Sequence, residues 1–329
     1  MAAGEPDDGV LADLITLGGA GLAVAELGRG EQVGSGPSAV RVGVCRQADL
    51  PVDGIEAFDI LLTDQTDPPR PWVSRPDLDE GLDRLRGQVD RQPVAAAVAA
   101  QVLRGTPALS FEDALGLESL AYSMLLASNG FRAWRIATPV RARPEEHAPR
   151  VVIEEAGGAL VIRLNRPARR NAVDAAMRDA LADALGFALE HPDAPPVTLS
   201  GAGPAFSAGG DLDEFGQAPD VGLAHLVRTL RSPAALVHAL GERITARLHG
   251  ACVGAGIEVP AAAGRVTAAP GSFFRLPEVS MGLIPGAGGT ASIPRRIGRH
   301  RAAWMAISGD DVDLATALAW GLVDAEAAP

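Results

Sequence analysis

Two glycine-rich segments, each with one glutamate, constrain this chain more than any other feature. One reads Gly254-Ala-Gly-Ile-Glu258, and the other contains Leu276-Pro-Glu278 followed by Gly286-Ala-Gly-Gly-Thr290. Glycines let backbone N–H groups approach a ligand closely, whereas an unpaired carboxylate is costly to bury. Two carboxylates framed by such loops can share a proton-transfer task. The pattern predicts an enzyme; the open alternatives are a solvated glutamate at a helix start for Glu258 and a surface-loop residue for Glu278.

The charge balance limits the classes of partner. The formal net charge is −12, and all 29 basic side chains are arginine because the chain has no lysine. This argues against general nucleic-acid binding, which depends on neutralising phosphates, but a local arginine cluster can still bind a small phosphorylated ligand. Hydrophobic residues make up 47% of the 329 residues and aromatic residues only 4%, so small aliphatic side chains must build most of the core.

Cysteine, histidine and the N-terminus exclude further classes. Cys45 and Cys252 are too few for a disulfide framework, and the six histidines lack metal-ligand spacing, so no metal site is expected. Residues 1–8 are acidic where a signal peptide would be basic. The apolar run from Leu11 to Leu27 is broken by charges and glycines and is a poor membrane span. A cytoplasmic protein without membrane contact is expected.

The pattern of the chain divides it into an N-terminal α/β region over residues 1–135, a proline-rich linker over 136–150 and a second α/β region over 151–329. In the first region, residues 40–45 and 58–63 favour strands and a helical period begins near residue 79. A second helix is expected after an N-cap at Ser110, with Leu117, Leu120 and Met124 as its apolar stripe and Asn129-Gly130 as its stop.

In the second region short strands alternate with helices. Strands are expected at residues 151–154, 159–164, 197–200, 244–248 and 266–268, with helices over 172–189 and from Gly254 and Gly288 onward. This alternation favours a layered α/β fold with parallel pairing. Glycine-rich turns at Gly203–Leu212 and at Gly254 could each present a free N–H to an anionic oxygen, although an ordinary glycine-rich turn is the competing interpretation of the first.

Five motifs in order give this region a resemblance to a known family. They are Asn165-Arg-Pro…Arg170-Asn-Ala172, Phe206-Ser-Ala-Gly-Gly-Asp-Leu212, His249-Gly-Ala-Cys-Val-Gly-Ala-Gly-Ile-Glu258, Leu276-Pro-Glu-Val-Ser-Met-Gly-Leu-Ile-Pro-Gly-Ala-Gly-Gly-Thr290 and Gly321-Leu-Val323. Together they resemble the crotonase (enoyl-CoA hydratase/isomerase) superfamily over about residues 151–324. The resemblance implies a crotonase-like ββα spiral core and a homotrimer or hexamer.

The resemblance also implies roles for individual residues. Ala208 and Ala255 fall where the family's two oxyanion-hole N–H groups hold the thioester oxygen of an acyl-CoA. Glu258 and Glu278 fall on the two carboxylates with which the hydratase branch adds water across an α,β-unsaturated thioester. No tightly bound cofactor is implied, because coenzyme A is part of the substrate. The residues expected to bind it are Arg166, Arg170, Ala172, Gly209, Gly210 and Asp211, with a solvated loop as the alternative for the arginines.

The chain departs from the family in three places. Alanine stands at position 255 where glycine is usual, and Pro260 and Gly264-Arg265 replace the usual residues that follow the glutamate. The family continues with further helices after Gly-Leu-Val, whereas this chain stops at Pro329. Helices over residues 80–135 are expected to take the place of those C-terminal helices. The alternative is an unrelated N-terminal α/β appendage.

Several functions remain open at the level of the sequence. A 2-enoyl-CoA hydratase is expected because both glutamates are present. An enoyl-CoA isomerase would need only one carboxylate, and a thioester hydrolase could use the same oxyanion hole. A non-catalytic acyl-CoA-binding subunit would suit the unusual residues Ala255, Pro260 and Arg265.

Overall fold

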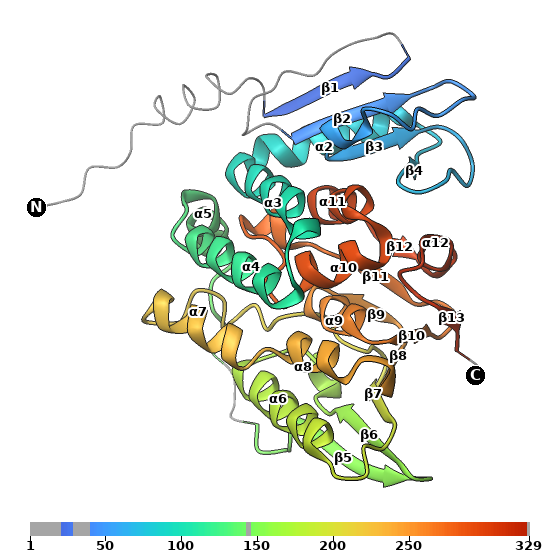
Figure 1. The fold of residues 1–329 in the computed structure, drawn as a ribbon. Helices are drawn as coiled ribbons and strands as arrows, with labels where there is room; N and C mark the ends of the chain where they lie inside the picture. The colour runs from blue at the N-terminus through green and yellow to red at the C-terminus, as the bar shows by residue number, and fades with distance from the viewer. Residues whose placement is uncertain (1–20, 29–39, 143–145, 328–329) are drawn as a thin grey trace, which may run out of the picture.

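The protein is represented by a computed structural model that describes residues 21–28, 40–142 and 146–327. Figure 1 shows β-sheets at the two ends of the molecule with helices stacked between them. The acidic residues 1–8 and the first half of the apolar run lie outside the described residues. Within the described ranges, no helix has the length and apolar character needed to span a membrane.

The first sheet has four parallel strands in sequence order. They are β1 (Leu22–Glu26), β2 (Val40–Cys45), β3 (Ile60–Thr63) and β4 (Val73–Ser74). The strand expected at 40–45 is confirmed, and the one expected at 58–63 begins at Ile60. Helices α2 (Leu78–Arg91) and α3 (Pro93–Gly105) follow, and α3 lies between this sheet and the rest of the molecule (Figure 1).

Helix α4 (Phe111–Leu126) has the predicted N-cap but a different buried face. The Asp113 N–H donates to Ser110 Oγ at 3.0 Å. The expected apolar stripe is wrong, because Leu120 and Met124 are exposed, whereas Glu118 and Ser119 are buried. The expected stop at Asn129-Gly130 is also wrong: α4 ends at Leu126, and these residues begin helix α5 (Asn129–Ala137), whose N-cap is Ser128.

A six-stranded sheet forms the opposite end of the molecule, in the order β13-β10-β8-β7-β6-β5. All its neighbours are parallel except β5 and β6. The strands are β5 (Val151–Ala156), β6 (Ala159–Leu164), β7 (Val197–Gly201), β8 (Ile244–Leu248), β10 (Arg265–Ala268) and β13 (Ala325–Glu326). Helices α6 (Ala175–Glu190) and α8 (Pro233–Leu240) pack together, and α6 contacts β5 and β6. The predicted α/β layering is confirmed.

A small third sheet lies between these two ends. It contains β9 (Ala251–Val253), β11 (Phe273–Arg275) and β12 (Val312–Asp313), and β9 and β11 are parallel. The remaining helices are α7 (Val221–Leu230), α9 (Ala255–Glu258), α10 (Gly289–Ile297), α11 (Arg299–Ser308) and α12 (Leu314–Trp320). Helix α10 contacts α4, and α11 contacts both α2 and α3.

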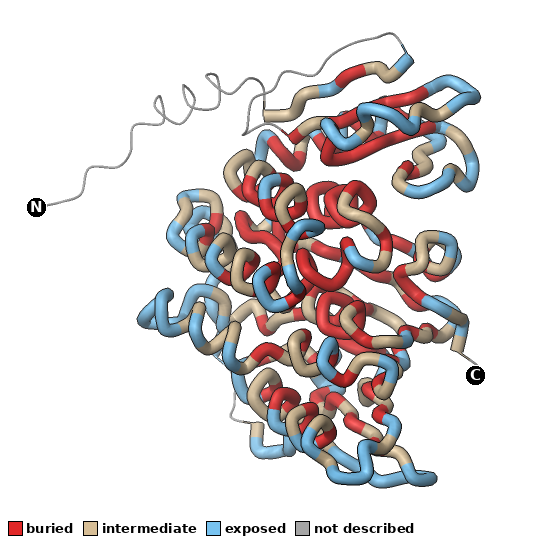
Figure 2. Tube along the Cα trace, in the orientation of Figure 1, coloured by how far each residue is buried: buried red, intermediate tan, exposed pale blue. Residues whose placement is uncertain are grey.

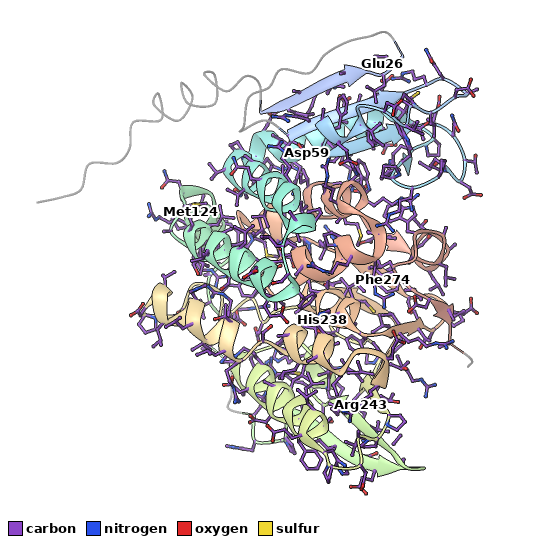
Figure 3. All side chains as sticks on the ribbon, in the orientation of Figure 1. Glu26, Asp59, Met124, His238, Arg243 and Phe274 are labelled. Atoms are coloured by element: carbon purple, nitrogen blue, oxygen red, sulfur yellow. The ribbon has the colours of Figure 1, made fainter. Side chains whose placement is uncertain are left out.

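The two regions share one hydrophobic interior. A single cluster of buried side chains extends from Val40 in the first sheet to Val323 near the C-terminus, and Figure 2 shows buried chain running through the centre of the molecule. Ring stacking adds to it, since His238 of α8 (labelled in Figure 3) stacks on Phe111 of α4 with centroids 4.0 Å apart. The N-terminal helices are therefore packed onto the C-terminal region.

Candidate active site

Parallel pairing of two short strands brings the predicted glutamates together. Arg275, the last residue of β11, is paired with Val253, the last residue of β9. The chain then continues to Glu278 on one side and to Glu258 on the other. Because the carboxyl ends of parallel strands meet at one edge of a sheet, both side chains arrive at the same place.

Glu258 is the last residue of the single-turn helix α9 and is buried. Its Oε2 accepts hydrogen bonds from the N–H groups of Ala287 and Gly289, at 2.8 and 2.9 Å. A Cβ on Gly289 would lie 2.8 Å from Oε2 of Glu258. Only a glycine therefore lets the loop backbone approach this carboxylate so closely. The loop after Gly286 thus holds one oxygen of Glu258 in a fixed position.

Glu278 begins a short 3₁₀ helix (Glu278–Met281) and is buried as well, and its Oε2 has no hydrogen-bond partner among the described residues. A Cβ on Gly254 would overlap Oε1 of Glu278 and would lie 3.7 Å from Oε1 of Glu258. Gly254 also has φ +50°, which favours glycine. The two carboxylates therefore converge above the Gly254 backbone.

Burial gives the two carboxyl groups different proton affinities. Desolvation raises the pKa of Glu258 to about 7, against the opposing effect of its backbone hydrogen bonds. Desolvation raises the pKa of Glu278 well above its ordinary value, and the negative charge of Glu258 raises it further. Both carboxyl groups therefore hold a proton more firmly than an exposed glutamate does, and the charge of one strengthens the hold of the other.

A third buried glutamate, Glu118 of α4, completes this cluster. Its Oε1 accepts from the Gly288 N–H at 2.7 Å, and its Oε2 accepts from the N–H and hydroxyl of Thr290 at 2.7 and 2.8 Å. Glu118 and Glu258 thus bind alternate N–H groups of the same glycine-rich loop. Burial and the charge of Glu258 raise the pKa of Glu118. Sequence reasoning missed Glu118, because its partners lie about 170 residues away and only a buried acid on a helix would have signalled it.

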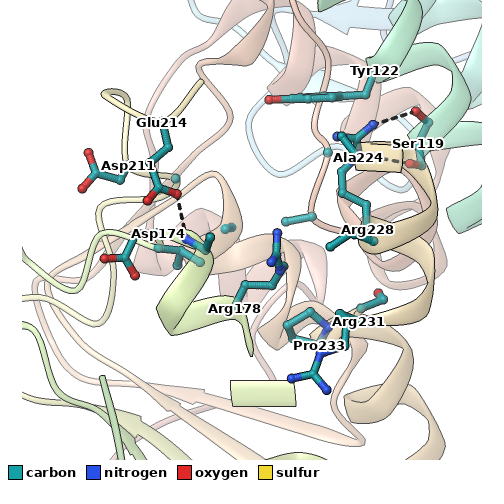
Figure 4. Close-up of a pocket in the computed structure, with 18 of the residues that line it drawn as sticks. Ser119, Tyr122, Asp174, Arg178, Asp211, Glu214, Ala224, Arg228, Arg231 and Pro233 are labelled. Atoms are coloured by element: carbon teal, nitrogen blue, oxygen red, sulfur yellow. Dashed lines mark hydrogen bonds between the residues drawn. The ribbon is translucent and has the colours of Figure 1, made fainter. Parts of the chain in front are cut away.

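The three glutamates line a cavity of about 610 Å³. Its walls come from α4, α6, α7 and the loops at Ser207–Asp220 and Gly286–Gly288. Figure 4 shows Asp174, Asp211 and Glu214 on one side and Ser119, Tyr122 and Arg228 on the other. A cavity of this volume matches those that hold small-molecule ligands. Among the described residues, no group of three or more acidic, histidine or cysteine side chains is placed to hold a metal ion.

The two expected oxyanion-hole residues differ in their surroundings. Ala255 lines the cavity as the first residue of α9, so its N–H has no acceptor within the helix. Its φ is not positive, and the alanine at this position therefore causes no backbone strain. The N–H of Ala208, in contrast, donates to the Arg170 carbonyl at 2.8 Å. Pro260 follows α9 and begins a separate 3₁₀ turn (Pro260–Ala262), so it does not interrupt α9.

Arg166 is buried in an ionic network. Its Nε and Nη2 donate to Glu146 at 2.7 and 3.1 Å, and its Nη1 donates to Asp211 Oδ2 at 2.7 Å and to the Ala172 carbonyl at 3.0 Å. Every guanidinium nitrogen therefore has a protein acceptor. This geometry favours a role in holding the loops at 166–172 and 206–212 together.

The other residues expected to contact coenzyme A are divided between the cavity and the surface. Gly210 and Asp211 line the cavity. Arg170 is exposed at φ +49°, next to the partly buried Ala172. Gly209 is buried with φ +93°, and a Cβ there would lie 2.8 Å from the Val253 carbonyl oxygen. Of the residues expected to contact coenzyme A, only Gly210 and Asp211 therefore line the cavity, whereas Arg170, Ala172 and Gly209 lie outside its lining.

Comparison with known proteins gives a consistent picture. A family model described as enoyl-CoA hydratase/isomerase matches residues 154–328. The chain is 32% identical to the mevalonyl-coenzyme A hydratase SIDH of Beauveria bassiana, covering 50% of this chain and 62% of that protein. It is 31% identical to the 2,3-dehydroadipyl-CoA hydratase of Escherichia coli, covering 53% and 67%.

Solved structures agree with these relatives. An enoyl-CoA hydratase from Thermoplasma volcanium is 32% identical with a TM-score of 0.51, covering 55% of this chain and 72% of that one. One from Bacillus anthracis is 30% identical with a TM-score of 0.50, covering 54% and 70%. The matched part of the chain spans 62% to 67% of the length of the curated relatives named above.

Proposed function

Because the chain belongs to the enoyl-CoA hydratase/isomerase family, we propose that it adds water across the double bond of a 2-enoyl-CoA thioester. The observation that carries this proposal is the convergence of the buried Glu258 and Glu278 side chains at Gly254, where burial raises the pKa of both. Addition of water needs both a base for the water and an acid for the carbon that receives hydrogen.

In the proposed reaction the two carboxyl groups have opposite tasks. Ionised Glu258 accepts a proton from water while the water oxygen bonds to C3. The π electrons of the C2–C3 bond then move towards C2 and the thioester oxygen, and protonated Glu278 delivers its proton to C2. The product is a 3-hydroxyacyl-CoA, and proton exchange with solvent restores both groups.

The negative charge that develops on the thioester oxygen needs N–H donors. Ala255 is placed to supply one, since its N–H lies at the start of α9 on the cavity wall. We propose Ala208 as the second donor, which requires its N–H to turn from the Arg170 carbonyl towards the substrate. For coenzyme A itself we propose the exposed Arg170 together with Ala172, Gly209, Gly210 and Asp211, and we assign Arg166 to holding these loops.

The N-terminal helices are part of this proposal. We infer that α4 occupies the place of the helices that cover the site at the C-terminus of other family members. Its contacts with the Gly286–Thr290 loop through Glu118 support this inference, as do the contacts of α4 with α7 and α10. We also propose a homotrimer or hexamer in the cytoplasm. Exposed leucines at 226 and 230 on α7 offer an apolar contact surface, and light scattering tests the assembly.

Steady-state assay with crotonyl-CoA tests the reaction. Hydration removes the absorbance of the conjugated thioester and yields a 3-hydroxyacyl-CoA without release of free thiol. Release of thiol would instead indicate thioester hydrolysis. Calorimetric binding of CoA thioesters without turnover would indicate a non-catalytic binding subunit.

A further inference from the structure

Arg228 of α7 is an arginine on the cavity wall that has no carboxylate partner among the described residues. Its Nε donates to Ser119 Oγ at 3.0 Å, and Nη2 contacts the Ser119 carbonyl and Ser123 Oγ. The guanidinium carbon lies 4.9 Å from the centroid of the Tyr122 ring. Three residues of α4 thus fix the guanidinium group, and Nη1 has no partner among the described residues.

The other two arginines that line the described part of the cavity are already paired, and two of its aspartates are as well. Arg178 and Arg231 bind Asp179 and Asp183 of α6 through contacts of 2.8 to 3.5 Å. On the opposite side, Asp174 pairs with Arg150 at 2.9 Å, Asp211 pairs with Arg166 at 2.7 Å, and Glu214 accepts from the Ala175 N–H at 2.7 Å. Among the arginines that the described lining of the cavity contains, Arg228 is therefore the one without an ion pair.

The carboxylate of Glu118 acts on Arg228 through space but does not form an ion pair with it. Glu118 favours the charged guanidinium, but both oxygens of Glu118 are bound to Gly288 and Thr290. Burial and the positive charge of Arg178 lower the pKa of Arg228. A partly buried, fixed cation without a counter-ion is costly, and an anionic ligand group would remove that cost.

We infer that Arg228 binds a carboxylate at the far end of the acyl chain, so that the substrates are CoA monothioesters of dicarboxylic acids. The inference rests on the proposed function, since it takes the cavity as the acyl site. Leu115, Leu126, Leu223 and Val227 line the same cavity as Glu258 and Glu278, as an acyl chain requires. Arginine binds carboxylate and phosphate alike. The acyl end is favoured because the exposed Arg170, proposed for the phosphates, lies outside the cavity lining.

Calorimetric binding of three saturated six-carbon acyl-CoAs tests this inference without requiring turnover. Their acyl chains end in a carboxylate, a carboxamide or a methyl group. The wild-type protein is expected to bind the carboxylate compound at least about tenfold more tightly than the other two, as is typical for hydrogen bonds to charged groups. Arg228→Met should weaken binding of that compound about 10- to 100-fold and leave the other two within about twofold, while Arg228→Lys should fall between.

Arg231→Met is the matched control, because Arg231 lines the same cavity but is already paired with Asp179 and Asp183. It should leave the preference unchanged. Equal weakening of all three compounds by Arg228→Met would place Arg228 on a CoA phosphate and overturn the inference. Equal binding of the three compounds by the wild-type protein would overturn it as well, even if the variant failed to fold. If carboxylate selectivity is observed but neither crotonyl-CoA nor the 2-enoyl form of the carboxylate compound is hydrated, the proposed function fails, and only the binding of a ligand carboxylate by Arg228 survives.

Discussion

The N-terminal region and the C-terminal core each place a buried glutamate against the same loop. Glu258 of the core uses one oxygen to bind the N–H groups of Ala287 and Gly289. Glu118 of α4 uses both of its oxygens on Gly288 and Thr290. The core glutamate can therefore still act on a ligand, whereas the N-terminal glutamate is committed to holding the loop. We therefore propose that the core supplies the chemistry and that the preceding helices supply the positioning.

Removal of a core carboxylate should have the largest effect. We expect Glu258→Gln and Glu278→Gln each to lower kcat for crotonyl-CoA hydration by about 10²- to 10⁴-fold, because each removes a proton-transfer group while keeping the shape of the side chain. Substrate binding should change little. If either variant keeps full activity, the assignment of chemistry to the core pair is wrong.

Removal of the Glu118 carboxylate should lower kcat by a smaller factor and should also lower the stability of the fold. Glu118→Ala leaves two N–H groups and one hydroxyl without acceptors, so we expect a loss of stability of about 2–4 kcal/mol and a fall in kcat of about 10- to 100-fold. Denaturant unfolding and initial rates measure the two. Glu112→Ala, which removes an exposed glutamate on the same helix, is the control and should change neither. A Glu118→Ala variant with wild-type stability and rate would contradict the proposal that Glu118 positions the loop.

The pH profile separates the two roles further. We expect kcat/KM to fall below pH of about 7 as Glu258 becomes protonated, and to fall again at higher pH as Glu278 loses its proton. The charge of Glu118 raises the pKa of Glu278, so Glu118→Gln should move the alkaline limb to lower pH. Because a merely structural defect would lower the rate without moving this limb, an unshifted profile would contradict the electrostatic coupling.

The smallest expected effect is on the pH dependence of thermal stability. A carboxyl group whose pKa is raised by folding stabilises the folded state fully below its ordinary pKa of 4.5, and this contribution is lost as pH rises through the raised pKa. The wild-type protein should therefore lose thermal stability as the pH rises above the ordinary pKa of 4.5. Glu278→Gln removes the group and should melt at least about 2 °C higher than wild type at pH 8. A variant with the same pH dependence as wild type would show that Glu278 is not held protonated.

The contrast between the regions also explains what the sequence could predict. Glu258 and Glu278 stand in ordered motifs, although the strands β9 and β11 that bring them together were not expected from the sequence. The strands at 40–45 and 244–248 were predictable because their apolar runs are local. Local patterns determine such features without knowledge of distant contacts.

The contribution of α4 could not be predicted in the same way. Its apolar residues Leu120 and Met124 suggested the buried face, but tertiary contacts bury Glu118 and Ser119 instead. Their partners, the Gly286–Thr290 loop and Arg228, are more than 100 residues away in sequence. A polar residue on a helix is ordinarily solvated, so only the packed structure identifies these two as parts of the site.

The fate of the water oxygen tests the central claim most directly. Crotonyl-CoA is incubated with the full chain in water enriched in oxygen-18, and the products are analysed by mass spectrometry. We predict a 3-hydroxyacyl-CoA that carries one oxygen-18 atom in its hydroxyl group, with no free CoA released, and labelling about 10²- to 10⁴-fold slower with Glu278→Gln. Oxygen-18 in a free carboxylic acid, or an unlabelled isomer as the only product, would contradict hydration by the Glu258–Glu278 pair.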